Sequence, residues 1–213
     1  MKKAVIIVDG GYFDGLDFYL QNNRGKRIDV GKLSKKICEE VAQSINEDVS
    51  HLRTYFYHAY PFRGPPSTPE REERYRNTQR FFLAINRIPN HEFVEVGRVL
   101  PQYLTCPNCK KNVMRPRQKG VDVAIALELV KMADQHVADL FILISGDEDL
   151  ARAIELAKGK LANVIVFFAY DPSNNLFASR KLTYTADDRK RMNLDFLEDC
   201  SRPWTPEEGH AEV

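Results

Sequence analysis

The chain has 213 residues, of which 43% are hydrophobic and 29% are charged. This size and composition fit one globular α/β domain with modest additions better than two domains. The 31 basic and 30 acidic residues leave a net charge of +1, which excludes a global positive field. Any nucleic-acid partner would therefore have to be held by local basic patches.

The first apolar run covers residues 4–8 and ends at Asp9, which Gly10 and Gly11 follow. The run is too short for a secretory leader, and no other run reaches the length of a membrane span. We therefore expect a cytoplasmic protein without a membrane partner, and thiols or metal ligands rather than disulfides at its four cysteines. The uninterrupted run itself predicts a strand at residues 3–8 that is buried on both faces, as in parallel sheets.

Further strands and helices alternate along the chain. Apolar spacing and β-branched or aromatic runs predict helices at residues 30–45, 70–88, 121–133 and 149–158, and strands at 52–60, 92–100, 140–145 and 164–170. This alternation predicts an α/β fold with a mainly parallel sheet of about five strands and helices on both faces. We expect one domain over residues 1–200, an insertion at about 101–119, and a loose tail over 201–213.

Aspartates follow two of the predicted strands. Asp9 ends the first strand, and Asp147 and Asp149 follow the strand at residues 140–145. Ligands of open parallel sheets bind beyond the carboxyl ends of the strands, so these aspartates meet at one rim if their strands are neighbours. Asp122 lies in the first turn of an almost wholly apolar helix. An ionised carboxylate there needs a partner, and a cation shared with the other aspartates would supply one.

Such a cluster suits phosphodiester hydrolysis. Carboxylates are the hard ligands that Mg²⁺ or Mn²⁺ prefers, and the ion can activate a water and offset the charge that develops at phosphorus. Taken singly, each aspartate has an ordinary alternative as a turn residue, helix cap or first-turn acid. Their positions at two strand ends and on one apolar helix favour the shared site. The predicted catalytic and metal-binding residues are Asp9, Asp122, Asp147 and Asp149.

Three stretches of the chain resemble the NYN domain, in particular its LabA-like branch, within the PIN-like nuclease folds. They are VIIVDGGYF from residue 5, KGVDVAIALELVKMA from residue 119 and LFILISGDEDLARAIELAKGK from residue 140. The resemblance extends over roughly residues 3–198 and is vaguer in the middle third. It implies a PIN-like, Rossmann-like sheet, a Mg²⁺ or Mn²⁺ cofactor, RNA as the substrate, and metal-site roles for the same four aspartates.

The chain departs from the family pattern at two places. Many members carry an asparagine shortly after the first aspartate, where this chain has Gly10, Gly11 and Tyr12. Glu148 stands between Asp147 and Asp149 where a small residue is usual, and we expect it to face solvent. The leading hypothesis is a metal-dependent endoribonuclease. The alternative is a regulatory module that binds RNA or DNA with weak cleavage or none.

A basic stretch lies directly before the helix that carries Asp122. Residues 110–119 contain five basic residues and no acidic residue, so they predict a loop that holds a phosphate backbone without sequence selectivity. An ordinary solvated loop is the alternative. The candidate substrate contacts are Lys110, Lys111, Arg115, Arg117 and Lys119, together with Ser145 and with Tyr12, which could stack on a base. Weaker candidates are Arg63, Arg98, Arg180 and Lys181.

Cys106 and Cys109 form a CxxC turn that resembles half of a zinc site. The sequence has no second CxxC. The alternatives are a zinc ion shared across a homodimer or completed by a histidine, a pair that has lost its metal, and a redox pair. His58 and His91 have no ligand spacing, and we expect them to be packed or exposed.

Overall fold

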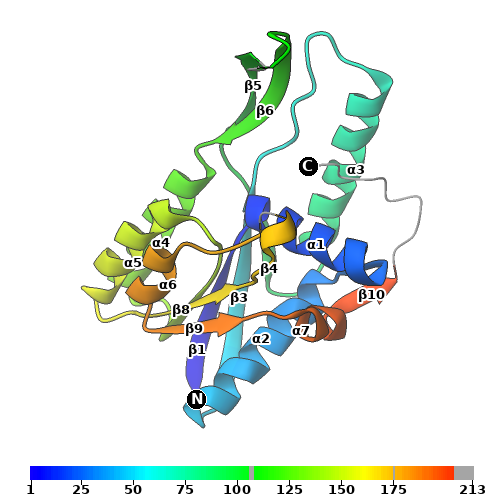
Figure 1. The fold of residues 1–213 in the computed structure, drawn as a ribbon. Helices are drawn as coiled ribbons and strands as arrows, with labels where there is room; N and C mark the ends of the chain where they lie inside the picture. The colour runs from blue at the N-terminus through cyan, green and yellow to red at the C-terminus, as the bar shows by residue number, and fades with distance from the viewer. Residues whose placement is uncertain (106–107, 175, 204–213) are drawn as a thin grey trace.

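A computed structural model describes residues 1–105, 108–174 and 176–203, with the backbone alone for residues 113, 115 and 116. Its centre is a six-stranded sheet of order β4-β3-β1-β7-β8-β9 (Figure 1), in which all pairings are parallel. These strands are β1 (Lys2–Asp9), β3 (Val49–His58), β4 (His91–Glu95), β7 (Leu140–Ile144), β8 (Asn163–Phe168) and β9 (Asp188–Arg191). The predicted α/β fold with a mainly parallel sheet is confirmed.

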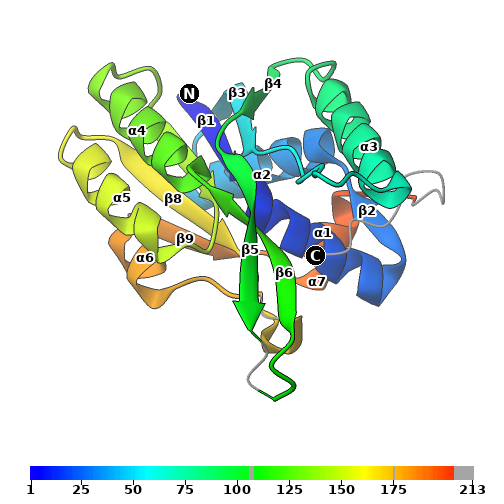
Figure 2. The same ribbon diagram turned by 90° about the horizontal axis from the view of Figure 1, so that it is seen from above.

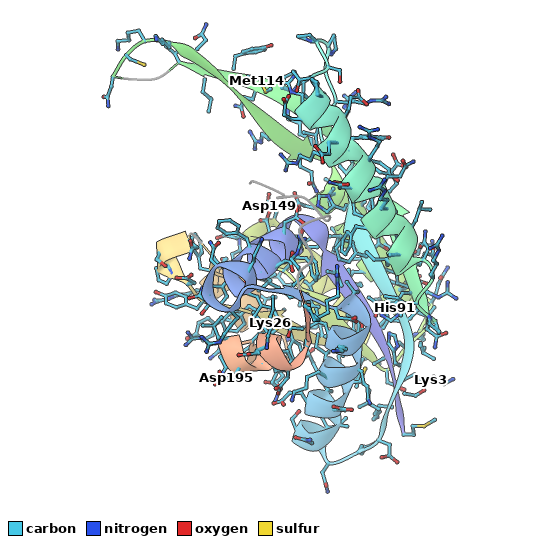
Figure 3. The ribbon with its side chains drawn as sticks, turned by 90° about the vertical axis from the view of Figure 1, so that its right-hand side faces the viewer. Lys3, Lys26, His91, Met114, Asp149 and Asp195 are labelled. Carbon is cyan, nitrogen blue, oxygen red and sulfur yellow. The ribbon has the colours of Figure 1, made fainter. Side chains whose placement is uncertain are left out.

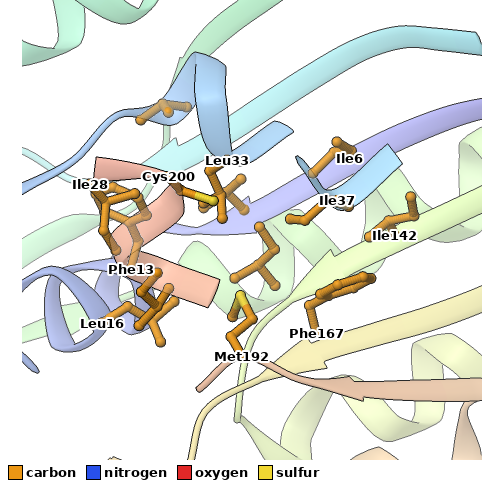
Figure 4. Packing of buried hydrophobic residues seen from close by; sticks show 14 of the residues in the cluster. Ile6, Phe13, Leu16, Ile28, Leu33, Ile37, Ile142, Phe167, Met192 and Cys200 are labelled. Atoms are coloured by element: carbon orange, nitrogen blue, oxygen red, sulfur yellow. The ribbon is translucent and has the colours of Figure 1, made fainter. Parts of the chain in front are cut away.

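Helices cover both faces of the sheet (Figure 2). One face carries α1 (Gly10–Arg24), α2 (Val30–Ile45), α3 (Pro69–Ile85) and α7 (Leu194–Asp199); the other carries α4 (Val121–Asp134), α5 (Ala151–Lys158) and α6 (Arg180–Thr185). Successive β1 side chains alternate between the two cores, because neighbouring residues of a strand point to opposite faces. Ile6 packs with Phe13 and Ile37 in the first core (Figure 4), and Ile7 packs in the second core.

The edge strand β9 was missing from the predicted strands. Its four residues, Asp188 to Arg191, are all charged, so no apolar run marks them. Backbone pairing with β8 alone makes this segment a strand. Charged residues on an edge strand discourage pairing with a further chain.

Helix α1 was also not foreseen, because Asp9-Gly10-Gly11 has the composition of a turn. In the structure β1 leads into α1 without a loop, and the Asp9 side chain caps the helix. Its Oδ1 accepts hydrogen bonds from the backbone N–H groups of Gly11 at 3.0 Å and Tyr12 at 3.4 Å. A Cβ atom on Gly10 would lie 2.4 Å from Cδ2 of His58, so glycine is needed where α1 crosses the end of β3.

The prediction of one strand at residues 92–100 and a basic loop after it was wrong. Strand β4 ends at Glu95, and a separate strand β5 (Arg98–Thr105) pairs antiparallel with β6 (Asn112–Lys119). Most of the basic stretch is therefore a strand. The hairpin projects from the rim of the main sheet (Figures 1 and 3). Gly97 adopts a φ of 69° at its base, where a Cβ atom would lie 2.3 Å from the carbonyl oxygen of Lys119.

Three smaller differences concern the second half of the chain. The helix predicted at residues 149–158 begins with a 3-10 turn, η1 (Glu148–Leu150), before α5. Part of the predicted tail is ordered, because β10 (Ser201–Pro203) pairs antiparallel with β2 (Lys26–Ile28). Residues 204–213 of that tail lie outside the described residues. None of the helices in the described part of the chain has the length and apolarity to cross a membrane.

Two neighbouring glycines at the start of α1 provide a matched pair of substitutions. Gly10→Ala should lower the free energy of unfolding by about 1–3 kcal/mol, because the new methyl group meets the His58 ring. Gly11→Ala should raise it by about 0.5–1 kcal/mol, because the nearest atom to a Cβ there is 3.5 Å away and alanine favours helix. Urea unfolding of both variants measures the difference, and equal effects would contradict the close approach of α1 to His58.

Candidate functional site

Asp9 lies at the carboxyl end of β1, in the middle of the sheet, with only 7% of its surface exposed. Ser145, directly after β7, donates its hydroxyl to Oδ2 of Asp9 at 2.9 Å. Burial raises the pKa of Asp9 to about 6, the hydroxyl of Ser145 opposes the rise, and the nearby Asp122 carboxylate adds to it. The ionised form of Asp9 is thus only partly compensated by its neighbours, and a cation at this point would be favourable.

Ser145 has a structural role that differs from the predicted contact with substrate. Its side chain is fully buried. While its hydroxyl donates to Asp9, its Oγ accepts from the backbone N–H of Asp147 at 3.2 Å. The Ser145 hydroxyl therefore connects the Asp9 carboxylate with the acidic segment after β7. Because the Ser145 side chain is fully buried, it has no exposed surface for a ligand.

The remaining three aspartates gather around the same rim. Asp122 is half-buried in the first turn of α4. Burial is the largest cause of its raised pKa, and the carboxylates of Asp147 and Asp149 raise it further. Asp147 caps η1 by accepting from the backbone N–H of Asp149 at 2.9 Å, and Asp149 is exposed. Asp122 therefore lies within electrostatic range of Asp9, Asp147 and Asp149.

The four carboxylates do not form a closed cage. Within the described residues, no three His, Cys, Asp or Glu side chains already stand close enough together to hold a metal ion. Mg²⁺ does not need such a cage, because it keeps several waters and binds through one or two carboxylates. Hard oxygen donors, with the raised pKa of the buried Asp9, fit Mg²⁺ or Mn²⁺ held partly through water.

The acidic segment, residues 147–149, and the preceding Gly146 pack against residues that precede α6. A Cβ atom on Gly146 would lie 2.4 Å from the carbonyl oxygen of Phe177 and 2.5 Å from Cε2 of Tyr12. The backbone N–H of Ser179 donates to the carbonyl of Gly146 at 2.9 Å. Glu148 is exposed as predicted, and it accepts from the hydroxyl of Ser179 at 3.1 Å. These contacts hold the loop that carries Asp147 in one position.

Tyr12 is not a free stacking surface. Its hydroxyl donates to the carbonyl of Ala169 at 3.2 Å and accepts from the Ala169 N–H at 3.0 Å. Burial raises the pKa of Tyr12 to about 12. The ring also packs on Gly146. The Tyr12 hydroxyl thus joins α1 to the end of β8, and the contact of Tyr12 with a base stays a prediction.

Sequence reasoning missed a polar pair beside Asp9. His58 ends β3, and its Nδ1 accepts from the Ala59 N–H at 2.8 Å, so the proton is carried by Nε2. That Nε2 donates to Oδ2 of Asp14 on α1 at 3.0 Å. No spacing along the sequence could indicate this pair, because the two residues are 44 positions apart. His91 is also engaged, with its Nε2 at 3.0 Å from the hydroxyl oxygen of Ser34.

The basic residues of the hairpin stand above this rim. Lys110, Lys111, Arg117 and Lys119 are exposed, and for Arg115 the backbone alone is described. Residues 96–120 contain no acidic residue. At the base of the hairpin, Oε1 of Gln118 lies 4.0 Å from the position of a Cβ atom on Gly11. The hairpin therefore begins next to the helix end that holds Asp9.

The weaker basic candidates differ in their partners. Arg63 pairs with Glu72 at 2.8 Å, and Lys181 pairs with Glu148 at 3.5 Å. Arg98 lies opposite Lys119 in the hairpin, and Arg180 is exposed at the start of α6. The ion pair with Glu72 gives Arg63 a structural role at α3. Arg98, Arg180 and Lys181 remain candidates at the rim.

The predicted zinc site is only partly within the described residues. Cys106 lies outside them, and Cys109 is an exposed free thiol. Zinc at Cys106 and Cys109, shared between two subunits or completed by a histidine, stays a prediction. Cys38 and Cys200 are buried free thiols, and burial raises their pKa to about 11 and about 12. The three described cysteines are thiols, as predicted.

Comparison with known proteins identifies the family. The model of the NYN domain matches residues 12–189. The chain belongs to the NYN domain family. The match to this NYN domain includes Asp122, Asp147 and Asp149 and begins just after Asp9. NYN domains belong to the PIN-like nuclease superfamily, whose members generally use divalent metals such as Mg²⁺ or Mn²⁺.

A solved structure supports the fold of this NYN domain. A protein of unknown function from Vibrio parahaemolyticus superposes with a TM-score of 0.55 at 19% sequence identity, over 94% of this chain and 96% of that chain. At this identity the likeness concerns the fold alone. No curated protein matches the chain.

The raised pKa of Asp9 predicts a pH-dependent stability. Between its ordinary pKa of 3.8 and its folded pKa of about 6, the folded protein binds a proton that the unfolded chain has lost. The free energy of unfolding therefore falls as the pH rises through this window, by up to about 3 kcal/mol. Asp9→Asn should remove the contribution of Asp9 to this dependence, while that of Asp122, whose pKa is also raised, remains. The variant should be more stable than the parent protein at pH 7 without metal. Urea unfolding in the presence of chelator from pH 4 to pH 7 measures this dependence. If the plots of unfolding free energy against pH ran parallel for the two proteins, the buried charge of Asp9 would be contradicted.

Proposed function

We propose that this NYN domain is a metal-dependent nuclease that cleaves RNA internally in the cytoplasm, and that it belongs to the LabA-like branch. The observation that carries the proposal is the buried Asp9 carboxylate, which shares one rim with Asp122, Asp147 and Asp149. Membership of the PIN-like nuclease superfamily supports the reaction class. The choice of RNA and of the LabA-like branch rests on the sequence resemblance.

In this proposal Asp9, Asp122 and Asp147 hold the ion, and the exposed Asp149 contributes to its hydration shell or coordinates it. When bound, Mg²⁺ or Mn²⁺ supplies an activated water and offsets negative charge at the phosphate. Ser145 and the backbone amides of Gly11 and Tyr12 in the first turn of α1 orient Asp9, so that its carboxylate stays in place as a ligand. The same contacts oppose the rise of the Asp9 pKa, which favours the charged form that a metal needs.

In this proposal the hairpin binds the phosphate backbone of the substrate. In the antiparallel register Arg98 lies opposite Lys119, and Leu100 lies opposite Arg117. Because side chains alternate along each strand, Arg98, Lys119 and Arg117 share one face of the ribbon. Three cations on one face without an acidic neighbour in the hairpin are suited to contacts with phosphates rather than with base edges.

The second candidate function is a module that binds nucleic acid and regulates without cleaving. The observation in its favour is the open arrangement of the carboxylates, since the described residues contain no ready-made metal cage. The two functions differ in a simple assay with labelled single-stranded RNA and Mn²⁺. A nuclease shortens the RNA and is stopped by chelator, whereas a binding module shifts the RNA intact.

Asp147→Asn should remove Mn²⁺-dependent cleavage, by a factor of at least about 100, because it deletes one of the charges that hold the ion. The fold should remain, because an asparagine oxygen can still cap η1 as Asp147 does. Cleavage rates and circular dichroism measure the two effects. Glu39→Gln, which neutralises an exposed acid on α2, is the matched control and should cleave normally. Full activity of Asp147→Asn would refute the assignment.

Replacing Arg117 and Lys119 together by alanine should weaken RNA binding to the same extent for all sequences. Each lost phosphate contact should reduce the slope of log affinity against log salt concentration by about 0.7 for single strands. Fluorescence anisotropy at several salt concentrations in chelator measures both quantities. The control pair Lys35→Ala with Lys131→Ala removes two exposed cations outside the hairpin, one on α2 and one in the last turn of α4. An unchanged slope in the hairpin variant would leave these residues as ordinary surface.

A further inference from the structure

Two exposed aromatic side chains, one beside the acidic loop and one on the hairpin, have no partner ring among the described residues. Tyr103 on β5 is 70% exposed, and Phe177 before α6 is 50% exposed. The other two strongly exposed aromatic residues of the described chain, Tyr170 and Tyr184, each lie under an arginine. Among the described residues no aromatic ring or cation contacts Tyr103 or Phe177 in this way. No described ring or cation thus covers the two rings, which leaves them available for a ligand as far as this part of the chain is concerned.

Phe177 is fixed in place although its ring is exposed. The segment before it is closed by two backbone hydrogen bonds between Asp171 and Leu176, of 2.6 and 2.9 Å, and the Leu176 side chain is buried. The Phe177 carbonyl packs on Gly146, and the Ser179 N–H bonds to the carbonyl of that same glycine. Gly146 precedes Asp147, so the backbone of Phe177 is held directly beside the acidic loop. A backbone held in advance loses little entropy when the segment binds a ligand.

Tyr103 lies on the face of the hairpin that meets the domain at its base. In the register Tyr103 is opposite Met114, and Val99 is opposite Gln118. Val99 packs on the second core, and Gln118 approaches Gly11. Alternation along β5 gives Val99 and Tyr103 the same face. The hairpin extends on the side of the molecule where η2 (Pro172–Asn174) projects, as two perpendicular views agree (Figures 2 and 3).

We propose that Phe177 stacks on an unpaired base next to the phosphate at the aspartates, and that Tyr103 stacks on a base further along the same strand. This inference rests on the proposed function only in that the ligand is a nucleic acid. Aromatic rings stack on every base, so the pair selects single strands over duplexes without selecting a sequence. The exposed Arg180, three residues after Phe177, is placed to contact the phosphate between stacked bases.

The test measures binding without cleavage, in chelator, with a fluorescein-labelled oligouridine of about 12 nucleotides. Phe177→Ala and Tyr103→Ala should each weaken binding by about 5-fold to 100-fold, the range expected for the loss of one stacked base. Phe177→Trp should restore the affinity, because tryptophan keeps the aromatic face. Tyr184→Ala, which removes an equally exposed ring on α6, is the matched control and should bind as the parent protein does.

A second readout separates stacking from a general loss of structure. An oligonucleotide with a single 2-aminopurine should lose fluorescence on binding when that base reaches Phe177, in the parent protein and in Phe177→Trp. The quenching should be absent with Phe177→Ala at a protein concentration that saturates the RNA. Unchanged affinity and unchanged quenching with Phe177→Ala would overturn the inference. It would also be overturned if this substitution changed only the self-association of the protein.

These outcomes are distinguishable from those of the nuclease proposal. Quenching that depends on Phe177, in a protein that never cleaves with Mn²⁺, supports the stacking residues and refutes the nuclease. Normal cleavage at the same bonds and with the same affinity by Phe177→Ala refutes the stacking residues and supports the nuclease. A parent protein that binds no single-stranded RNA or DNA refutes the stacking proposal directly.

Discussion

The buried carboxylate of Asp9 is the constraint around which the candidate site is built. It stands at the end of the central strand, where the Ser145 hydroxyl and two backbone amides compensate its charge in part. Burial of this charge is only partly offset by these neighbours, so the pKa of Asp9 is raised to about 6. A protein that keeps an acidic group in such a place gives up stability in the metal-free state. A cation beside Asp9 would relieve that cost, so the proposed divalent ion would also stabilise the fold.

Close packing around Asp9 depends on two glycines. Gly10 leaves room for the His58 ring, and Gly146 leaves room for Tyr12 and for the Phe177 carbonyl. The start of α1, strand β3 and the segment before α6 thus converge at one point of the rim, where the His58 and Tyr12 rings pack directly on glycine backbone. Because interiors at native density do not deform smoothly, such contacts hold the carboxylates in a single arrangement. Catalysis by positioned charge requires this kind of rigidity.

The hairpin with its basic residues is attached to the same rim. It leaves the sheet after β4 at Gly97 and returns at Gly120, immediately before the helix turn that carries Asp122. The base is narrow, since a Cβ atom on Gly120 would lie 3.4 Å from Cα of Gly97. A ribbon with basic residues on one face and Tyr103 on the other is thereby attached directly to the acidic site. Charge attraction along the hairpin and repulsion at the aspartates would hold a phosphate backbone above the rim until a cation screens the carboxylates.

The sequence by itself determined the elements that depend on local pattern. These are the buried strands around Asp9 and Ser145, the apolar helix of Asp122, and the position of Asp9, Asp147 and Asp149 at one edge, which follows from parallel strands ending together. Only the tertiary structure decided the start of α1, the hairpin, the bridging role of Ser145, the His58–Asp14 pair and the exposed ring of Phe177. Each of these depends on contacts between residues far apart in the chain, such as β9 pairing with β8 or Gly10 against His58. Local periodicity carries no information about such contacts, because it records which side of an element is buried and not what buries it.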